Sequence, residues 1–199
     1  MNIIKSYFQF KQPLTQRQST KYIIIHHRGG DGDVESIHRL HLKNGYSGIG
    51  YHFYIRKDGQ VFQGRPKETV GAHCLNNNYN SVGICFEGNF ENEEMGYAQK
   101  KAGAELVSYL KKLYADARVV CHRDMLQTAC PGKNFPFDAV KYGIKEKNLL
   151  TSANDIAWEL SQKIEILDID GFVRALESAE KVGSPLYWGY YKIVNGQGA

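Results

Sequence analysis

The chain has 199 residues, of which 42% are hydrophobic and 23% are charged. This composition is ordinary for a globular protein and excludes a disordered or collagen-like chain, and the length allows one full domain plus a small appendage. Lysine and arginine outnumber aspartate and glutamate by 25 to 21, a net charge of +4 with no basic tract, so nucleic acid is not an expected partner.

The first residues of the chain and its cysteines indicate the cellular compartment in which the protein is made. The first ten residues, MNIIKSYFQF, lack the apolar stretch and small residues of a secretory signal. No later stretch reaches the roughly 18 apolar residues that span a bilayer. We therefore expect synthesis in the cytoplasm without a signal peptide, and no membrane insertion. The cysteines are too few for a disulfide scaffold, so free thiols are expected: Cys74, Cys85, Cys121 and Cys130.

The first predicted elements are a buried strand and a helix. The β-branched run 22–25 is typical of a strand buried on both faces, and it ends in the segment HHRGG at 26–30. Asp33 is the predicted N-cap of a helix that Asn44 and Gly45 end. Its apolar positions recur at helical spacing: Val34, Ile37 and Leu40.

A hairpin and another strand come next. The segments 51–57 and 60–64 flank Asp58-Gly59, which is a strong two-residue hairpin signal. The run SVGICFE at 81–87 reads as a further buried strand.

A long helix and a last strand complete the first domain. The short strand 118–121 leads directly into His122. The order of strand, helix, hairpin, strand, helix, strand predicts an α/β fold with a mixed central β-sheet flanked by helices, within a domain over 1–148. The long helix, after Asn92, has one apolar stripe: Ala102, Leu106, Tyr109, Leu110 and Leu113.

Residues 151–199 are predicted to form a separate small helical module, near the lower size limit for folding unaided. Thr151 or Ser152 can cap a first helix, and a second follows Asp170. The tail packs four aromatic side chains into a short stretch: Tyr187, Trp188, Tyr190 and Tyr191. Two interpretations stay open, because these rings can present flat faces to sugars or can form the core of the module and pack it on the first domain.

Side chains able to bind a metal gather at predicted strand ends and in loops: His26, His27, His52, His73, His122 and Cys130. A catalytic zinc site needs three ligands among imidazole, thiolate and carboxylate, plus one open position. The seven residues between His122 and Cys130 let the chain return to the same ion, and the Pro131-Gly132 turn would fix the thiolate. The spacing between His122 and Cys130 is longer than the short spacings typical of structural zinc sites. The alternative to a metal site is therefore that these His and Cys side chains are simply packed in the fold.

Four segments together resemble the zinc N-acetylmuramoyl-L-alanine amidases, a family that includes bacteriophage endolysins and peptidoglycan recognition proteins. They occur in the family's order and cover roughly residues 15 to 140: TKYIIIHH at 20–27, GYHFYIRKDGQVFQGR at 50–65, VGAHCLNNNYNSVGICFEGNF at 70–90 and CHRDMLQTACPG at 121–132.

The resemblance implies one Zn²⁺ ion held by His26, His122 and Cys130, with Tyr51 as a catalytic residue. It implies a second catalytic position at Thr128, where similar phage enzymes often have lysine and catalytic recognition proteins often have threonine. A neutral hydroxyl donates one hydrogen bond where lysine supplies a full cation.

The resemblance also implies that His27, His73 and Asn80 contact the substrate. Each has an alternative, because His27 can contact the sheet behind the site, Asn80 can simply cap a turn and His73 can simply bond the backbone. Some relatives have glutamate at the position of Cys85, so no general base is assigned. Glu87 is expected to end its strand at a polar rim.

The expected reaction is hydrolysis of the amide between N-acetylmuramic acid and L-alanine in peptidoglycan, by a phage or prophage endolysin that reaches the cell wall after holin-mediated release. In this interpretation 151–199 is a module that binds cell wall. The alternatives are a peptidoglycan-binding module without catalysis, a cytoplasmic amidase that recycles muropeptides, and a thiol hydrolase using Cys130 with His122. The sequence does not determine the stem peptide, the host or the oligomeric state.

Overall fold

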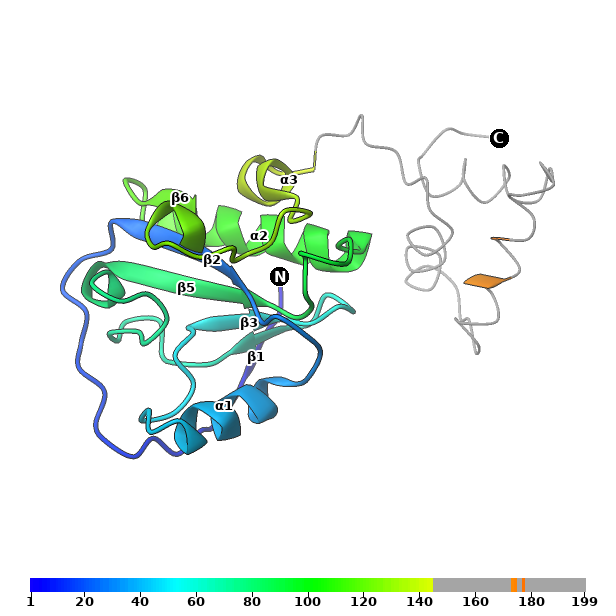
Figure 1. The fold of residues 1–199 in the computed structure, drawn as a ribbon. Helices are drawn as coiled ribbons and strands as arrows, with labels where there is room; N and C mark the ends of the chain where they lie inside the picture. The colour runs from blue at the N-terminus through cyan, green and yellow to red at the C-terminus, as the bar shows by residue number, and fades with distance from the viewer. Residues whose placement is uncertain (145–172, 175–176, 178–199) are drawn as a thin grey trace. The chain divides into compact units, whose positions relative to one another are not determined.

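A computed structural model describes residues 1–144 and, beyond them, only 173, 174 and 177 (Figure 1). Within this described part, Met1–Met95 and Gln99–Ile144 form one compact unit. The described residues include no helix with the length and hydrophobicity of a membrane span. The predicted module over 151–199, with its aromatic tail, lies outside the described residues apart from those three positions, and it stays a prediction.

The unit is built on one six-stranded mixed sheet, in the order β1-β4-β3-β5-β2-β6. All neighbouring strands are parallel except β3 and β4, which form the antiparallel hairpin. The predicted mixed α/β fold is therefore confirmed. The strands are β1 (Ile3–Lys5), β2 (Tyr22–His27), β3 (Phe53–Ile55), β4 (Val61–Gln63), β5 (Ser81–Phe86) and β6 (Arg118–Cys121).

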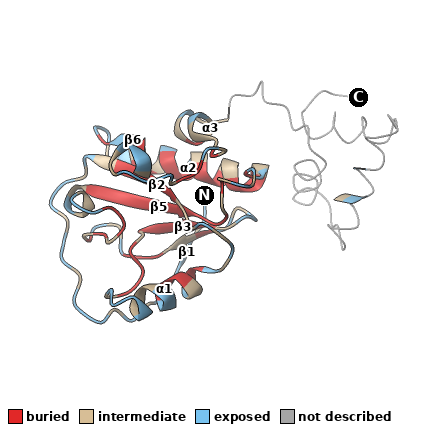
Figure 2. Cartoon of the chain, in the orientation of Figure 1, coloured by how far each residue is buried: buried red, intermediate tan, exposed pale blue. Residues whose placement is uncertain are grey.

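Two helices cover opposite faces of the sheet (Figure 1). Helix α2 (Tyr97–Leu113) packs on one face over the main core, and α1 (Val34–Lys43) packs on part of the other. Strand β5 is buried along its whole length, as Figure 2 shows, and its neighbour β2 is buried at all but its first and last residues. The remaining helical elements are short: η1 (Asn78–Asn80), η2 (His122–Asp124) and α3 (Phe137–Tyr142).

The alternation of side chains along β2 decides which residues can reach a common site. Ile23 and Ile25 belong to the core under α2, whereas Ile24 packs in a separate cluster on the other face. Because side chains alternate along a strand, His26 lies on the same face as Ile24, and His27 lies on the α2 face. The face with His26 is the one that α1 covers only in part.

The structure corrects several details of the predicted elements. Asp33 does cap α1, since its side chain accepts a hydrogen bond from the backbone N–H of Ser36 at 2.7 Å. Leu40 and Leu113, however, are 48% and 46% exposed, so the predicted apolar stripes are wrong at both positions. The predicted Val34 and Ile37 are buried in α1, and the third buried side chain is His38 in place of Leu40; its Nδ1 accepts a hydrogen bond from the Ile49 N–H.

Glu87 directly follows β5 and joins two loops to its end. One carboxylate oxygen accepts from the Gly32 N–H at 2.9 Å and the other from the Lys57 N–H at 3.0 Å. We expect Glu87→Ala to lower the free energy of unfolding by about 2 kcal/mol, because both charge-assisted hydrogen bonds are lost. Glu68→Ala, which removes an exposed carboxylate paired with Lys67, should cost less than about 1 kcal/mol. Denaturant unfolding measures both, and equal losses would contradict the role of Glu87.

Candidate metal and catalytic site

Three potential metal ligands from distant parts of the sequence meet at one end of the sheet. His26 lies near the end of β2, His122 follows β6, and Cys130 lies in the loop after it. Strands β2 and β6 are parallel neighbours, and Ile25 pairs with Cys121. The residues that follow this pair, His26 and His122, therefore lie side by side. The ligand atoms of this His-His-Cys cluster lie within 4.8 Å of one another, and His26 Nδ1 is 3.9 Å from Cys130 Sγ.

The chemistry of the cluster fits a cation such as zinc. His26 is buried and His122 and Cys130 are partly exposed, and the three offer two imidazoles and one thiol, a ligand set typical of zinc. Burial lowers the pKa of both histidines, so both rings are neutral and keep a lone pair for a metal. The Nε2 atom of His122 is buried without a hydrogen-bond partner among the described residues. A metal ion bound to this nitrogen would explain why it lacks one.

The thiol of Cys130 is poorly suited to act as a free nucleophile. Burial raises its pKa to about 11, so it stays protonated at neutral pH unless a cation binds it. A metal ion reverses this preference, because a coordinating thiol is deprotonated. The electrostatics therefore favour metal ligation over the alternative of a thiol hydrolase.

Backbone contacts hold Cys130 against β2. The His27 N–H donates to Cys130 Sγ at 3.4 Å, and the Cys130 carbonyl accepts from the Arg123 N–H at 2.9 Å. The Thr128 hydroxyl accepts from the Cys130 N–H at 3.2 Å. Thr128 itself is exposed.

Tyr51 lies beside the cluster, just before β3. Its ring centroid is 5.1 Å from that of His26, and its hydroxyl hydrogen-bonds the Cys85 thiol. Burial, together with Cys85, raises the pKa of Tyr51 well above its usual value, so the hydroxyl keeps its proton and can donate it. His41 fixes the backbone ahead of it, since His41 Nδ1 accepts from the Gly50 N–H at 3.0 Å.

His73 lies behind His26 and is buried. Its Nδ1 is 3.0 Å from His26 Nε2, on the side of the His26 ring away from Cys130. The predicted site residue His73 is therefore in contact with a predicted ligand, and its predicted contact with substrate remains a prediction.

Two other predicted substrate contacts lie further away. His27 sits on the opposite face of β2, where its Nδ1 accepts from the Phe90 N–H at 3.2 Å. Asn80 immediately precedes Ser81, which pairs with Tyr22 at the far end of β2, about 13 Å in strand length from the level of His26. Their roles remain predictions.

The sequence assigned no role in the site to three residues that the structure brings into or next to it. Cys85 is the cross-strand partner of His26, Ser81 lies 3.4 Å from His73, and His41 orients the segment before Tyr51. Cross-strand pairing could have indicated Cys85, because both strands were predicted. The other two depend on how loops fold back onto the sheet, for which the sequence carries no signal.

His52 is buried next to His73 and serves the fold. Its Nδ1 accepts from the Gly83 N–H at 3.0 Å and its Nε2 bonds the Thr69 carbonyl at 2.9 Å, so the neutral ring is satisfied on both sides. Burial is the main cause that lowers its pKa to about 3. The folded protein therefore excludes a proton that the unfolded chain binds below about pH 6.5.

This exclusion predicts acid sensitivity. The contribution of the neutral His52 ring to the free energy of unfolding is fully present above about pH 6.5 and falls as the pH drops towards 3. Between pH 7 and pH 5 this group alone should lower the free energy of unfolding by about 2 kcal/mol. Free energies of unfolding from denaturant titrations at pH 7, 6 and 5 measure the loss. An unfolding free energy that stays constant over this interval would contradict the buried neutral ring.

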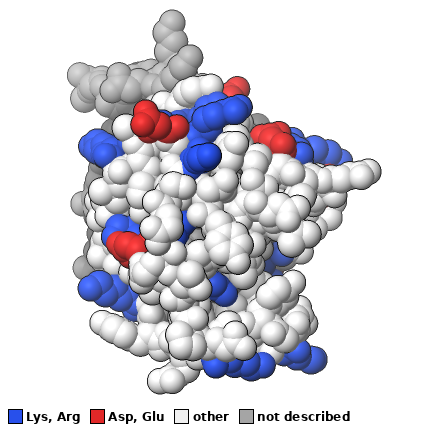
Figure 3. All heavy atoms as spheres, turned by 90° about the vertical axis from the view of Figure 1, so that its left-hand side faces the viewer, with Lys and Arg blue, Asp and Glu red and all other residues white. Residues whose placement is uncertain are grey.

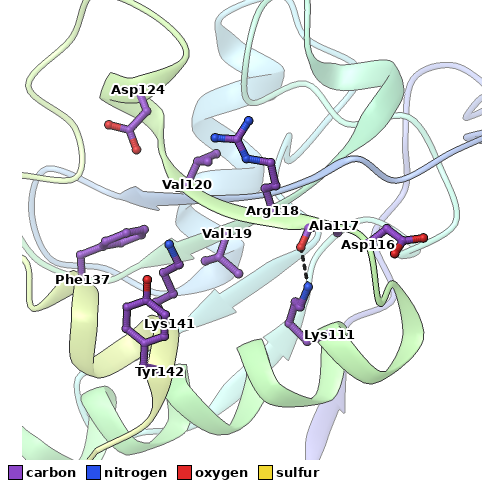
Figure 4. Close-up of a pocket in the computed structure, with 10 residues that line it drawn as sticks. All are labelled: Lys111, Asp116, Ala117, Arg118, Val119, Val120, Asp124, Phe137, Lys141 and Tyr142. Atoms are coloured by element: carbon purple, nitrogen blue, oxygen red, sulfur yellow. Dashed lines mark hydrogen bonds between the residues drawn. The ribbon is translucent and has the colours of Figure 1, made fainter.

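A hollow of about 530 Å³ is lined by none of the three cluster residues (Figure 4). It opens along β6, between the end of α2 and α3, and Figure 4 shows Lys141 beside Phe137 and Tyr142. Its lining contains basic, acidic and aromatic side chains but no histidine or cysteine. It therefore lacks the donor set of the His-His-Cys cluster.

Charged side chains are spread over the surface. On the face seen in Figure 3, lysine and arginine are more abundant than aspartate and glutamate, with uncharged surface between them. This agrees with the net charge of +4 and favours approach to an anionic partner more than specific recognition.

Comparisons with known proteins match the part of the chain that holds the cluster. A family model described as N-acetylmuramoyl-L-alanine amidase matches residues 16–133, a range that contains His26, His122 and Cys130. The endolysin of Klebsiella phage KP32 is 35% identical over 153 residues, which cover 72% of this chain and 97% of that endolysin. Peptidoglycan-recognition protein SC2 of Drosophila melanogaster is 32% identical over 126 residues, which cover 57% of this chain and 68% of that protein.

Solved structures share the fold. The N-acetylmuramoyl-L-alanine amidase LysC from Clostridium intestinale URNW aligns with a TM-score of 0.69 and 37% identity, over 71% of this chain and 96% of that structure. The Ph2119 endolysin of a Thermus scotoductus bacteriophage aligns with a TM-score of 0.66 and 28% identity, over 72% of this chain and 99% of that structure.

Proposed function

The chain belongs to the N-acetylmuramoyl-L-alanine amidase family and is a peptidoglycan hydrolase of the phage endolysin type, and we propose that it works with one zinc ion held by the His-His-Cys cluster. The observation that carries this proposal is the convergence of His26, His122 and Cys130, with their ligand atoms within 4.8 Å of one another. The orphaned Nε2 atom of His122 supports it. The bond cleaved is the amide between N-acetylmuramic acid and L-alanine.

Zinc bound there would supply a Lewis acid that polarises the scissile carbonyl and makes water nucleophilic near neutral pH. The protein's own contribution is to orient the ligands and to stabilise the charge that develops on the carbonyl oxygen. His26 is held from behind by His73, and the loop that carries Cys130 is tied to β2 through the His27 N–H. These contacts set the directions of two of the three ligands.

We assign Tyr51 as the main donor to the developing oxyanion. Its hydroxyl is protonated, it lies beside His26, and its partner in the free enzyme is the Cys85 thiol. A thiol is a weak hydrogen-bond acceptor, so turning the hydroxyl from Cys85 to the substrate costs little. Thr128 is assigned as a second, weaker donor, because its exposed hydroxyl accepts from the Cys130 N–H and keeps its own proton free to donate.

The biological role proposed is lysis of bacterial cells by degradation of the wall from within. The similarity to endolysins of bacteriophages supports this role. We propose that the chain reaches the wall after holin-mediated release, that His27, His73 and Asn80 contact the substrate and that the segment 151–199 adds affinity for the wall. The excess of basic side chains supports attraction to an anionic wall.

The metal assignment can be tested by elemental analysis of the full chain. Purified protein should contain one zinc per chain, lose it with its wall-lytic activity on chelation, and recover both when zinc is added back. His122→Ala should fail to retain zinc, whereas Glu68→Ala, far from the cluster in the sequence and exposed, should retain it. Full lytic activity of protein stripped of metal would contradict the proposal.

A further inference from the structure

A line of hydrogen bonds runs from His26 into the protein, away from the proposed metal site. The Nε2 atom of His26 lies 3.0 Å from Nδ1 of His73. On the other side of the His73 ring, Nε2 lies 3.4 Å from the Ser81 hydroxyl. The Ser81 hydroxyl in turn donates to the backbone carbonyl of Asn77 at 2.6 Å.

The end of this line fixes the position of every proton in it. A carbonyl oxygen only accepts, so the single proton of the Ser81 hydroxyl is committed to Asn77. The Ser81 oxygen must then accept from His73, which places the His73 proton on Nε2. The shorter 2.6 Å contact to the carbonyl favours this direction over the reverse one, in which Ser81 would donate to the imidazole.

The same logic carries through to His26. His73 and His26 are both buried and hydrogen-bond to neutral groups, and a buried unpaired charge is costly, so each ring is neutral and carries one proton. With its proton on Nε2, His73 accepts at Nδ1 from the His26 Nε2–H. The Nδ1 atom of His26 is then left with a lone pair, and this is the atom that lies 3.9 Å from Cys130 Sγ.

The His73 ring is locked in this position by its surroundings. A Cβ atom on Gly83 would lie 2.5 Å from the ring, and one on Gly71 would lie equally close, so the ring occupies a space that two glycines leave open. The backbone N–H groups of His73 and Cys74 both donate to the Asn78 side chain, at 2.8 and 3.0 Å. The ring is therefore a fixed part of the structure.

We propose that Ser81 and His73 are positioning residues that select the tautomer of His26, so that its Nδ1 faces the cluster without a proton. The proposal rests on the proposed function, because a lone pair at this atom is useful only to a ligand. A histidine ligand needs its second nitrogen hydrogen-bonded to fix its tautomer and orientation. The family motifs point to His73 but not to Ser81, whose hydroxyl lies two contacts away from the ligand atom.

The direct test is a measurement of tautomers in the metal-free full-length chain. Long-range ¹H–¹⁵N NMR distinguishes the two ring nitrogens of each histidine, and the His26 signals are assigned by their loss in His26→Asn. In the wild type we expect the proton of His26 on Nε2. In Ser81→Ala the buried His73 Nε2–H loses its acceptor, so the proton should move to Nδ1 of His73 and force that of His26 onto Nδ1.

Zinc affinity, measured by competition with a chelating dye, gives a second readout. Ser81→Ala should weaken zinc binding by about 10- to 100-fold, the range typical for losing a residue that orients a ligand. Ser81→Thr keeps the hydroxyl and should keep the wild-type tautomer and affinity. Ser47→Ala is the matched control, because it deletes a hydrogen-bonded hydroxyl that contacts Gln12 instead.

The outcomes separate this proposal from the proposed function. A proton on Nδ1 of His26 in the wild type would overturn the proposal even if the protein binds zinc. Unchanged tautomer and unchanged zinc affinity in a folded Ser81→Ala variant would also overturn it. Failure of the wild type to bind zinc would instead overturn the proposed metal site, whereas the tautomers of the metal-free protein would still be measured.

Discussion

Replacing Cys130 by serine is expected to abolish both zinc retention and hydrolysis. Cys130 is the only thiol of the His-His-Cys cluster, and its Sγ lies 3.9 Å from His26 Nδ1. Serine keeps the shape of the side chain but supplies an alcohol that stays protonated, which makes it a poor zinc ligand. The loss of zinc affinity should exceed the roughly 100-fold upper range for losing a residue that only orients a ligand.

The measurement is zinc content after dialysis, together with the rate of wall lysis. Cys74→Ser is the matched control, since Cys74 is also a free thiol but lies outside the cluster. The control should keep its zinc. A Cys130→Ser protein that retains one zinc per chain would remove Cys130 from the ligand set. Inactivation by alkylation in fully zinc-loaded protein would favour a thiol nucleophile.

Tyr51→Phe is expected to lower kcat by about 100- to 1000-fold, the usual cost of removing one oxyanion donor. The substitution deletes only the hydroxyl and keeps the ring, whose centroid lies 5.1 Å from that of His26. Zinc content should not change, because Tyr51 is not a member of the cluster. KM should change little, because the lost interaction forms mainly in the transition state.

A second tyrosine provides the control for this prediction. Tyr54 is fully buried on β3 and its hydroxyl donates to the Gly32 carbonyl, so Tyr54→Phe removes a buried hydroxyl that takes no part in the reaction. We expect kcat of Tyr54→Phe to stay within a few-fold of the wild type. A similar kcat for Tyr51→Phe and the wild type would remove Tyr51 from the reaction, and a large rise in KM alone would reassign it to substrate binding.

The elements that the sequence predicted best are those with strong local patterns. The β-branched run that became β2, the Asp58-Gly59 hairpin and the cap at Asp33 each carry a physical signal within a few residues. The strand β1 and helix α3 were not predicted, since they have only 3 and 6 residues. Their formation depends on packing against the rest of the unit, which local patterns do not report.

The site was predictable where it coincides with family motifs and unpredictable where it depends on long-range folding. Strand ends brought attention to His26 and His122, and the structure places both in the cluster with Cys130. The contact between His26 and His73 joins residues 47 positions apart, through a loop that folds back over β5. Nothing in the spacing of these residues indicates that contact, because it is set by the space left open at Gly71 and Gly83.

The most direct test of the account is mass spectrometry of the products released from purified cell wall, with the zinc-loaded protein and with the chelated protein. The account predicts free stem peptides that begin with alanine only when zinc is present, and glycan strands that remain uncut in both samples. Release of the same peptides by metal-free protein would contradict the metal assignment. Cleavage within the glycan strands or within the peptides would contradict the assigned reaction.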